Sequence, residues 1–255
     1  MPRFVGRRRR APALPAGTRV YAIGDVHGEA LLLSRLLARI EDDNAARGPS
    51  DTAIVLVGDV IDRGPFGAEL ATALSRLTDP RFTVLKGNHE AAMVAAWDGD
   101  EEAAIHWLRH GGDATLAGFL GGPAPSIDAE PALIWSTIRA AVPLGVINWM
   151  RELPLTLTLG DYLFVHAGVR PGVSIDRQHP ADLLRIREPF LSSPRAHGRI
   201  VVHGHSKTDG QIDFRDNRIG IDTGAYDTGV LTALGLEGEE QWTLSVGIDE
   251  VALAA

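Results

Sequence analysis

The sequence predicts an α/β fold of mixed β-sheets sandwiched by helices, with a helical insertion in its middle. Strand and helix patterns alternate over the first 90 residues, the segment about 90–152 is helical and loop-rich, and strand patterns return in the last third. The composition is that of an ordinary globular protein, because 45% of the 255 residues are hydrophobic and 23% are charged. We therefore expect one domain over 20–255, with the insertion inside it.

The first third has the order of a βαβαβ unit. Apolar runs at 20–24, 53–57 and 82–86 predict strands, and a glycine-containing loop follows each of them. Between these runs, apolar side chains at helical spacing predict one helix over 30–40 and another around Leu70, Leu74 and Leu77. This alternation favours a parallel sheet that is covered on both faces.

The rest of the chain changes character twice. Helical stretches are expected near 90–97, 101–109, 132–141 and 144–152, on either side of a Gly/Pro/Ala segment at 118–131. Strands are expected at 162–166, 199–203, 218–222, 229–236 and 241–246. Because the last two are separated only by an acidic turn at 237–240, they predict a hairpin, which makes the sheet mixed.

The first nineteen residues differ in composition from the rest. They hold six of the 25 basic residues and no acid, so 20–255 carry 19 basic against 33 acidic residues, a formal charge of −14. We expect a basic, disordered tail, with docking to nucleic acid or an acidic partner as its alternative. The acidic body is a poor non-specific nucleic-acid binder, and no run approaches the roughly 18 apolar residues of a membrane span. A cytoplasmic location without membrane contact is expected.

Five strand ends carry side chains that can bind metal ions. A single acid or amide after a strand is usually part of a turn, and a buried histidine is usually a satisfied core residue. Five such positions at successive strand ends instead indicate a site for two metal ions, and the absence of cysteine restricts its ligands to oxygen and imidazole donors. The candidates are Asp25, His27, Asp59, Asn88, His166 and His205, with His203 in reserve.

These motifs together resemble the calcineurin-like metallophosphoesterases. The Asp62-Arg63-Gly64 ending of the second motif narrows the resemblance to the phosphoprotein phosphatase family, in its bacterial and phage branch. The likeness runs from about 20 to 226 and includes 107–112 and 183–188. It implies two divalent metal ions, with manganese as the first choice and iron or zinc as alternatives.

The resemblance also implies a role for each residue. His205 is favoured over His203 because the family's ligand is the histidine of Gly204-His205-Ser206; His203 is then expected to orient a neighbour. The implied ligands are Asp25 and His27 on the first ion, Asp59 bridging both, and Asn88, His166 and His205 on the second.

The expected reaction is a direct attack on phosphorus. Two ions about 3.5–4 Å apart can share a water and lower its pKa towards about 7, which supplies hydroxide for in-line attack. Arg63, Arg187 and Asn88 are expected to bind the phosphate, with Arg185 as the competitor of Arg187. His89, paired with Asp62, is expected to protonate the leaving oxygen, and a helix cap is the alternative for His89. His110 keeps no assigned role, and Asp222 and Tyr226 are expected either to border the site or to form a turn.

The resemblance implies a metal-dependent phosphomonoesterase, in the first place a serine/threonine protein phosphatase acting on phosphorylated proteins or small phosphoesters. One alternative is a dinucleoside polyphosphate hydrolase, which shares the metal motifs but tends to lose the acid found here at Asp62. The others are a promiscuous small-molecule phosphoesterase and a non-catalytic phosphate-binding protein. The presence of Asp62 favours the protein phosphatase, and the intact ligand set disfavours the binding protein.

Overall fold

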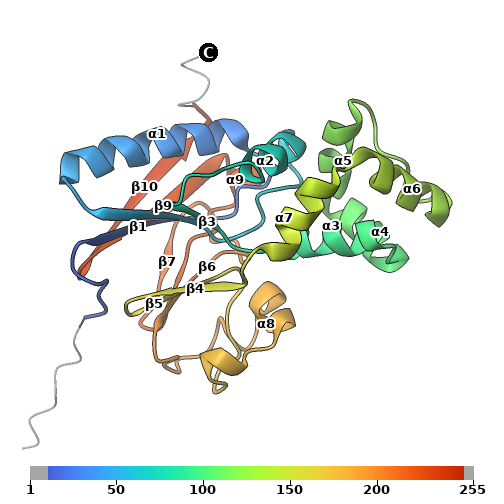
Figure 1. The fold of residues 1–255 in the computed structure, drawn as a ribbon. Coiled ribbons are helices and arrows are strands. Elements are labelled where there is room, and N and C mark those ends of the chain that lie inside the picture. Colours follow the sequence, from blue (N-terminus) through green and yellow to red (C-terminus); the bar gives the residue numbers. More distant parts are fainter. Residues whose placement is uncertain (1–10, 250–255) are drawn as a thin grey trace, which may run out of the picture.

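A computed structural model describes residues 11–249 and arranges them around two five-stranded sheets (Figure 1). Sheet A has the strand order β10-β9-β1-β2-β3, in which β1, β2 and β3 are parallel and β9 is antiparallel to β1 and β10. Its strands are β1 (Thr18–Ile23), β2 (Asp51–Leu56), β3 (Phe82–Val84), β9 (Val230–Glu237) and β10 (Glu240–Gly247).

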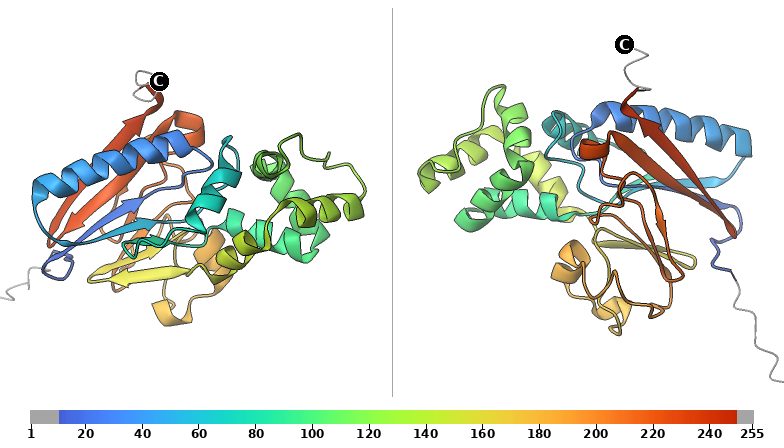
Figure 2. Two further views of the ribbon diagram at one scale, coloured as in Figure 1. Left: turned by 45° about the horizontal axis from the view of Figure 1, so that its top comes forward. Right: turned by 180° about the vertical axis from the view of Figure 1, so that it is seen from behind.

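Sheet B has the order β4-β5-β6-β8-β7, with parallel pairing in its centre and antiparallel pairing at both edges. Its strands are β4 (Thr156–Leu159), β5 (Tyr162–Val165), β6 (Ile200–His203), β7 (Asp213–Phe214) and β8 (Arg218–Gly220). Figure 2 shows this sheet lying against sheet A from two further sides. The predicted α/β fold with mixed sheets is therefore present, with the strands divided between two sheets.

One apolar layer joins the two sheets. Val20 and Val55 of sheet A and Phe164 and Val202 of sheet B are fully buried in it. The other face of sheet A carries helices, so the central strands β1 and β2 are apolar on both faces. The parallel strands of sheet A are covered on both faces, as predicted, by helices on one face and by sheet B on the other.

Helices cover the outer faces. Leu32, Leu36 and Ile40 of α1 are buried on the outer face of sheet A, and Leu183 of α8 belongs to the cluster beside sheet B. The insertion lies to one side of the sheets in Figure 1. The helices are α1 (Ala30–Arg47), α2 (Gly67–Leu74), α3 (Asn88–Asp98), α4 (Glu101–Trp107), the π-helix η1 (Leu108–Gly112), α5 (Asp113–Leu120), α6 (Pro131–Ala141), α7 (Leu144–Glu152), the 3₁₀ turn η2 (Ile175–Arg177), α8 (Pro180–Arg185) and α9 (Ala225–Thr228).

A short strap ahead of β1 ties the two sheets together. The backbone N–H of Ala13 donates to Asp161 Oδ2 at 3.0 Å, and the N–H of Asp161 donates back to the Ala13 carbonyl at 3.0 Å. The N–H of Leu14 donates to the carbonyl of Gly238 at 2.9 Å, on the sheet A side. The strap therefore lies beside the starts of β1 and β5, away from the ends that carry the ligand motifs.

The boundary of the basic tail needs a correction. Residues 1–10 lie outside the described part of the chain, but the strap and β1 begin before residue 20. Arg19 is only 1% exposed, and its Nε lies 2.9 Å from Glu237 Oε2. Its charge is thus part of the folded body, because the buried guanidinium has an acidic partner.

No single helix within residues 11–249 is long and apolar enough to cross a membrane. Helices α6 and α7 reach that length and apolarity only as a pair, and the chain bends by 91° between them.

Candidate metal centre

Loops that follow β1, β2, β3, β6 and β8 line one cavity of about 260 Å³. Carboxyl ends of parallel strands meet at the same edge of a sheet, so loops distant in sequence converge there. The cavity collects most of the residues singled out in the sequence, together with several that were not, whereas Asp25, Asp62, His166 and His203 are not among its lining residues. Its lining consists of His27, Asp59, Arg63, Asn88, His89, Ala92, His106, Trp107, His110, Arg185, Arg187, His205, Lys207, Asp222 and Tyr226.

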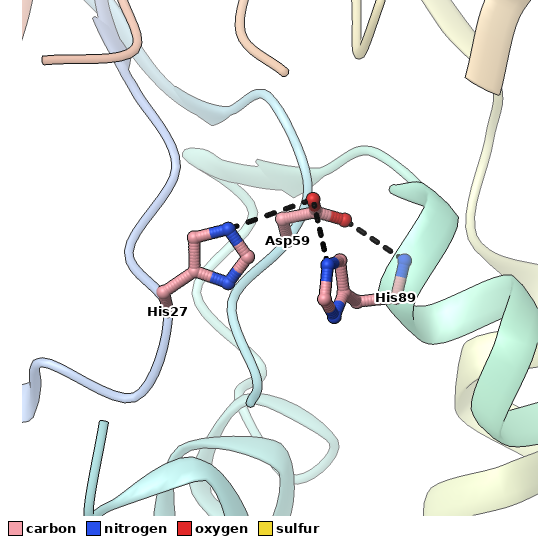
Figure 3. A group of neighbouring side chains, drawn as sticks. All are labelled: His27, Asp59 and His89. Carbon is pink, nitrogen blue, oxygen red and sulfur yellow. Dashed lines mark hydrogen bonds and ion pairs between the residues drawn. The ribbon is translucent and has the colours of Figure 1, made fainter. Parts of the chain in front are cut away.

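Asp59 lies at the centre of this cavity. Its Oδ2 atom is 3.7 Å from His27 Nε2, 3.8 Å from His89 Nε2 and 3.3 Å from His166 Nε2 (Figure 3 shows the first two). Two groups of potential ligand atoms share this carboxylate, one with His27 and His89 and one with His166 and His205. Within each group all ligand atoms lie within 4.8 Å of one another. A carboxylate shared by two groups is what a bridging ligand requires.

The backbone at these positions is unusual. Asp59 has φ +49°, His27 +47° and His205 +62°, in the left-handed region that non-glycine residues adopt only at an energetic cost. Gly204 beside His205 is required for space, because a Cβ atom there would meet Asp25 Oδ1 at 1.9 Å. Such strain is commonly found at functional sites.

His166 directs its two ring nitrogens at different partners. Its Nδ1 lies 3.0 Å from the carbonyl oxygen of Val57, which can only accept, so the ring donates there. In the neutral ring, Nε2 then carries a lone pair, yet it faces Asn88 Oδ1 at 2.9 Å and Asp59 Oδ2 at 3.3 Å. Burial favours a lowered pKa for His166, but Asp59 outweighs it and raises the pKa, so either a proton or a metal ion can lie between these acceptors. A divalent metal ion fits this donor set.

His27 repeats this arrangement. Its Nδ1 donates to the carbonyl of Ile61 at 3.0 Å, which leaves the Nε2 lone pair directed towards Asp59. Burial lowers the pKa of His27 to about 3, despite the nearby Asp59, and burial likewise lowers that of His205 to about 3. Both rings are neutral at pH 7, the state in which imidazole binds metals.

The carboxylates of Asp25, Asp59 and Asp222 lie close enough to affect one another's pKa. Asp25 Oδ2 accepts the N–H of His205 at 2.9 Å, whereas its buried Oδ1 has no hydrogen-bond partner among the described residues. Burial, then Asp222 and Asp59, raise the pKa of Asp25 well above its ordinary value. For Asp59, burial favours a raised pKa, but His166 and His89 outweigh it and hold the pKa well below the ordinary value. Asp25 belongs to neither of the two close groups, although it follows β1 as predicted.

Glu90 is a site residue that sequence reasoning missed. Its carboxylate accepts three backbone N–H groups, from Asp59 at 3.0 Å, Gly87 at 2.8 Å and Val60 at 2.9 Å. It therefore fixes the loop after β2 against the start of α3, and with it the position of Asp59. Burial and the nearby Asp59 raise the pKa of Glu90 to about 7. The available signal was an acid directly after the Gly-Asn-His motif.

The helical insertion holds the Asp62–His89 pair. His89 Nδ1 lies 2.6 Å from Asp62 Oδ2, and Asp62 also accepts the indole N–H of Trp107 and the hydroxyl of Thr115, both at 2.8 Å. Burial favours a lowered pKa for His89, but Asp59 and Asp62 outweigh it and raise the pKa to about 9. Arg63 Nη2 lies 3.4 Å from His89 Nε2.

The remaining basic residues surround the open side of the cavity. Arg63 lies over the ring of Tyr226, with its Cζ 4.3 Å from the ring centroid. Arg185 and Arg187 both line the cavity, so the choice between them stays open. Lys207, which sequence reasoning also missed, lies beside them. The predicted border residues Asp222 and Tyr226 and the unassigned His110 are lining residues as well.

His203 lies apart from the cavity. Its Nδ1 donates to the carbonyl of Gly204 at 3.0 Å, and its ring packs 5.0 Å from that of Phe190. Burial lowers its pKa to about 4. It thus belongs to the packing behind the His205 loop, where its Nε2 lies 3.4 Å from Arg218 Nη1.

A family model described as calcineurin-like phosphoesterase matches residues 18–230. The chain belongs to this family. The resemblance inferred from the motifs and the predicted fold are both confirmed by this match. The candidate ligand groups around Asp59 agree with the metal dependence of the family.

The relatives carry two kinds of name. A symmetrical bis(5′-nucleosyl)-tetraphosphatase of Dechloromonas aromatica is 29% identical over 174 residues, which are 68% of this chain and 51% of the relative. Serine/threonine-protein phosphatase 2 of Escherichia coli is 39% identical over 95 residues, 37% of this chain and 38% of that one. The chain thus spans about half the length of the first of these curated relatives and a smaller share of the second.

A solved structure described as a candidate diadenosine tetraphosphatase has the same fold, with a TM-score of 0.64. The alignment covers 92% of this chain and 98% of that one, at 20% identity.

Proposed function

We propose that this chain is a two-metal phosphoesterase that hydrolyses dinucleoside polyphosphates. The observation that carries the proposal is the charge of the cavity, where Arg63, Arg185, Arg187 and Lys207 gather around Asp59. A phosphomonoester carries a charge of about −2 at neutral pH, and a chain of four phosphates carries roughly twice as much. The names of most of the similar curated proteins support the same substrate class.

The proposal assigns the ligands as the motifs imply. Asp25 and His27 would hold one ion, Asn88, His166 and His205 would hold the other, and Asp59 would serve both, with manganese as the first choice. When bound, the two ions stabilise charge on the phosphate oxygens and acidify a water. His89 Nε2 lies 3.8 Å from Asp59 Oδ2, but we do not assign it as a ligand, because the Arg63 guanidinium 3.4 Å from this nitrogen disfavours a second cation there.

The chain's own residues then bind and orient the substrate. Arg63 and Arg187, with Asn88, present planar donors to the phosphate oxygens, where negative charge develops in the transition state. Tyr226 supports the Arg63 guanidinium through its ring face. A nucleotide leaving through its phosphate is already a stable anion, so His89 donates a hydrogen bond to it without having to transfer its proton.

A second candidate, a serine/threonine protein phosphatase, rests on a different observation. The 2.6 Å contact between His89 and Asp62 is the arrangement of a general acid and its partner. An alkoxide leaves badly unless it is protonated, so a phosphoserine or phosphothreonine substrate would use this pair fully. The two candidates therefore differ in whether His89 must deliver a proton.

The deciding experiment compares kcat/KM for diadenosine tetraphosphate and for a phosphothreonine peptide at one fixed concentration of free Mn²⁺. We expect the dinucleotide to be preferred. A preference for the phosphopeptide would replace this proposal by the second candidate, and equal values would indicate a promiscuous phosphoesterase. Silence on both substrates and on p-nitrophenyl phosphate would indicate a binding protein. Asp59→Asn is the control for contaminating activity.

A further inference from the structure

A pair of stacked histidines forms one wall of the cavity and has no part in the proposed reaction. The rings of His106 and His110 lie 4.0 Å apart between centroids, with 22° between their planes. They come from the last turn of α4 and from the π-helix η1, one helical turn apart. Both residues are exposed, and neither belongs to the two ligand groups around Asp59.

The pair is held in place. His110 Nδ1 donates to the carbonyl oxygen of His106 at 2.7 Å, which fixes the second ring against the first. Partial burial, then His110 and Arg185, lower the pKa of His106, so its ring is neutral at pH 7. Two nearly parallel rings of exposed residues offer a surface on which another aromatic ring can stack.

The pair is also fixed relative to the reacting centre. Directly after His110, Gly111 has φ +103°, and its carbonyl accepts the backbone N–H of Arg63 at 3.0 Å. A Cβ atom at Gly111 would meet Arg63 Cγ at 2.6 Å, so this close approach requires glycine. One segment thus positions both the proposed phosphate-binding Arg63 and the histidine pair.

We propose that the His106–His110 pair stacks the nucleobase of a bound nucleoside polyphosphate, with Arg185 contacting its phosphates. This inference rests on the proposed function and adds a base-recognising subsite to it. Histidine is one of the side chains on which unpaired bases stack, and Arg185 lies near enough to His106 to affect its charge. A polyphosphate without a base would contact only the basic side chains. A nucleotide would contact both the basic side chains and the histidine pair.

Equilibrium binding tests the subsite without relying on turnover. The full chain, loaded with Mn²⁺ at a fixed free concentration, is titrated calorimetrically with adenosine 5′-(β,γ-imido)triphosphate and with inorganic tripolyphosphate. Because stacking on an aromatic side chain strengthens binding by about five- to tenfold or more, the nucleotide should bind more tightly than tripolyphosphate by at least that factor. In His110→Ala and His106→Ala this advantage should fall to about twofold or less, while the Kd of tripolyphosphate stays unchanged.

Two further variants separate stacking from other roles. His110→Phe keeps an aromatic face but no ring nitrogen, and should retain the nucleotide's advantage. His179→Ala, an exposed histidine at the start of α8, should leave both Kd values unchanged. The subsite is overturned if wild type binds both ligands equally, if the alanine variants weaken both alike, or if His110→Phe behaves like His110→Ala. The last result would indicate a ring nitrogen acting as a metal ligand or hydrogen-bond partner.

The proposed function has its own readout, which is turnover of diadenosine tetraphosphate. A chain that discriminates in binding but prefers the phosphopeptide in turnover would keep the subsite and lose the substrate proposal. A chain that cleaves diadenosine tetraphosphate but binds the nucleotide and tripolyphosphate equally would keep the substrate proposal and lose the subsite.

Discussion

The two sheets and the helical insertion contribute different things to the same cavity. Strand ends of both sheets carry the proposed metal ligands, in loops held by glycines and by the buried carboxylate of Glu90. The insertion, about 90–152, follows closely after the proposed ligand Asn88 and supplies Trp107 and Thr115 to Asp62. It also presents the histidine pair. We infer that the sheets hold the metal site, while the insertion orients the Asp62–His89 pair and adds one wall to a cavity that basic residues outside the insertion also line.

Among the changes to the metal site on the sheets, Asp59→Asn should have the largest effect. The change removes the charge that three imidazoles face, so both ions lose their shared ligand. We expect turnover of p-nitrophenyl phosphate to fall below detection, a loss of more than about 5 kcal/mol in transition-state stabilisation. Stabilisation of the fold by Mn²⁺, measured as a rise in Tm, should be largely lost. Near-normal activity would disprove the two-metal assignment; Asp98→Asn, on the surface of α3, is the matched control.

His89→Ala tests the acid pair that His89 forms with Asp62, where the sheets meet the insertion. If His89 protonates the leaving oxygen, kcat for a phosphoserine peptide should fall about 100-fold or more, the usual contribution of a general acid. The loss with p-nitrophenyl phosphate should be far smaller, because its leaving group needs little protonation. Measuring both substrates at saturating Mn²⁺ separates these effects. Equal losses would remove His89 from the acid role.

Glu90→Gln tests how much the hydrogen bonds of Glu90 stabilise the loop after β2, and its expected effect is smaller. The amide has one acceptor oxygen, and its NH₂ group would face a backbone N–H that the carboxylate now accepts. We expect a decrease in the free energy of unfolding of about 2 kcal/mol, measured by urea denaturation. Glu152→Gln, at the end of α7, should change it by less than about 0.5 kcal/mol. An unchanged midpoint in Glu90→Gln would show that the loop is held by other contacts.

The smallest expected effect lies in the insertion. Trp107→Phe keeps most of the buried ring but removes one of the donors to Asp62. The loss of one hydrogen bond, about 0.5–1.5 kcal/mol, corresponds to a fall of roughly two- to tenfold in kcat for alkyl phosphates. Activity on p-nitrophenyl phosphate should change by less than about twofold. If both substrates lost activity alike, the insertion would act on the whole site and the division between the regions would fail.

Sequence patterns found the strands of the sheets that end in ligands, because apolar runs followed by glycine and an acid are local signals. They could not divide the strands between two sheets, because β9 joins sheet A through pairing with β1 more than 200 residues earlier. The helix α5 was hidden by Gly118, whose missing side chain allows contact with Ala68. The strands β4 and β7 and the helices α8 and α9 are too short to show a period.

The site was predicted unevenly for the same reason. Residues inside motifs, such as His89 and Asp62, were found together with their pairing. Glu90 was missed because two of the N–H groups it accepts lie 30 and 31 positions earlier in the chain. Lys207 was missed because a lysine two residues after a ligand has no distinctive pattern. The tertiary fold alone brings it to the cavity.

The strap formed by Ala13 and Leu14 marks a place where the chain could be attached to a surface without blocking the cavity. It enters beside the starts of β1 and β5, whereas the cavity opens at the opposite ends of these strands. A chain anchored to a sensor chip or a bead through this end would present its cavity to the flowing solution.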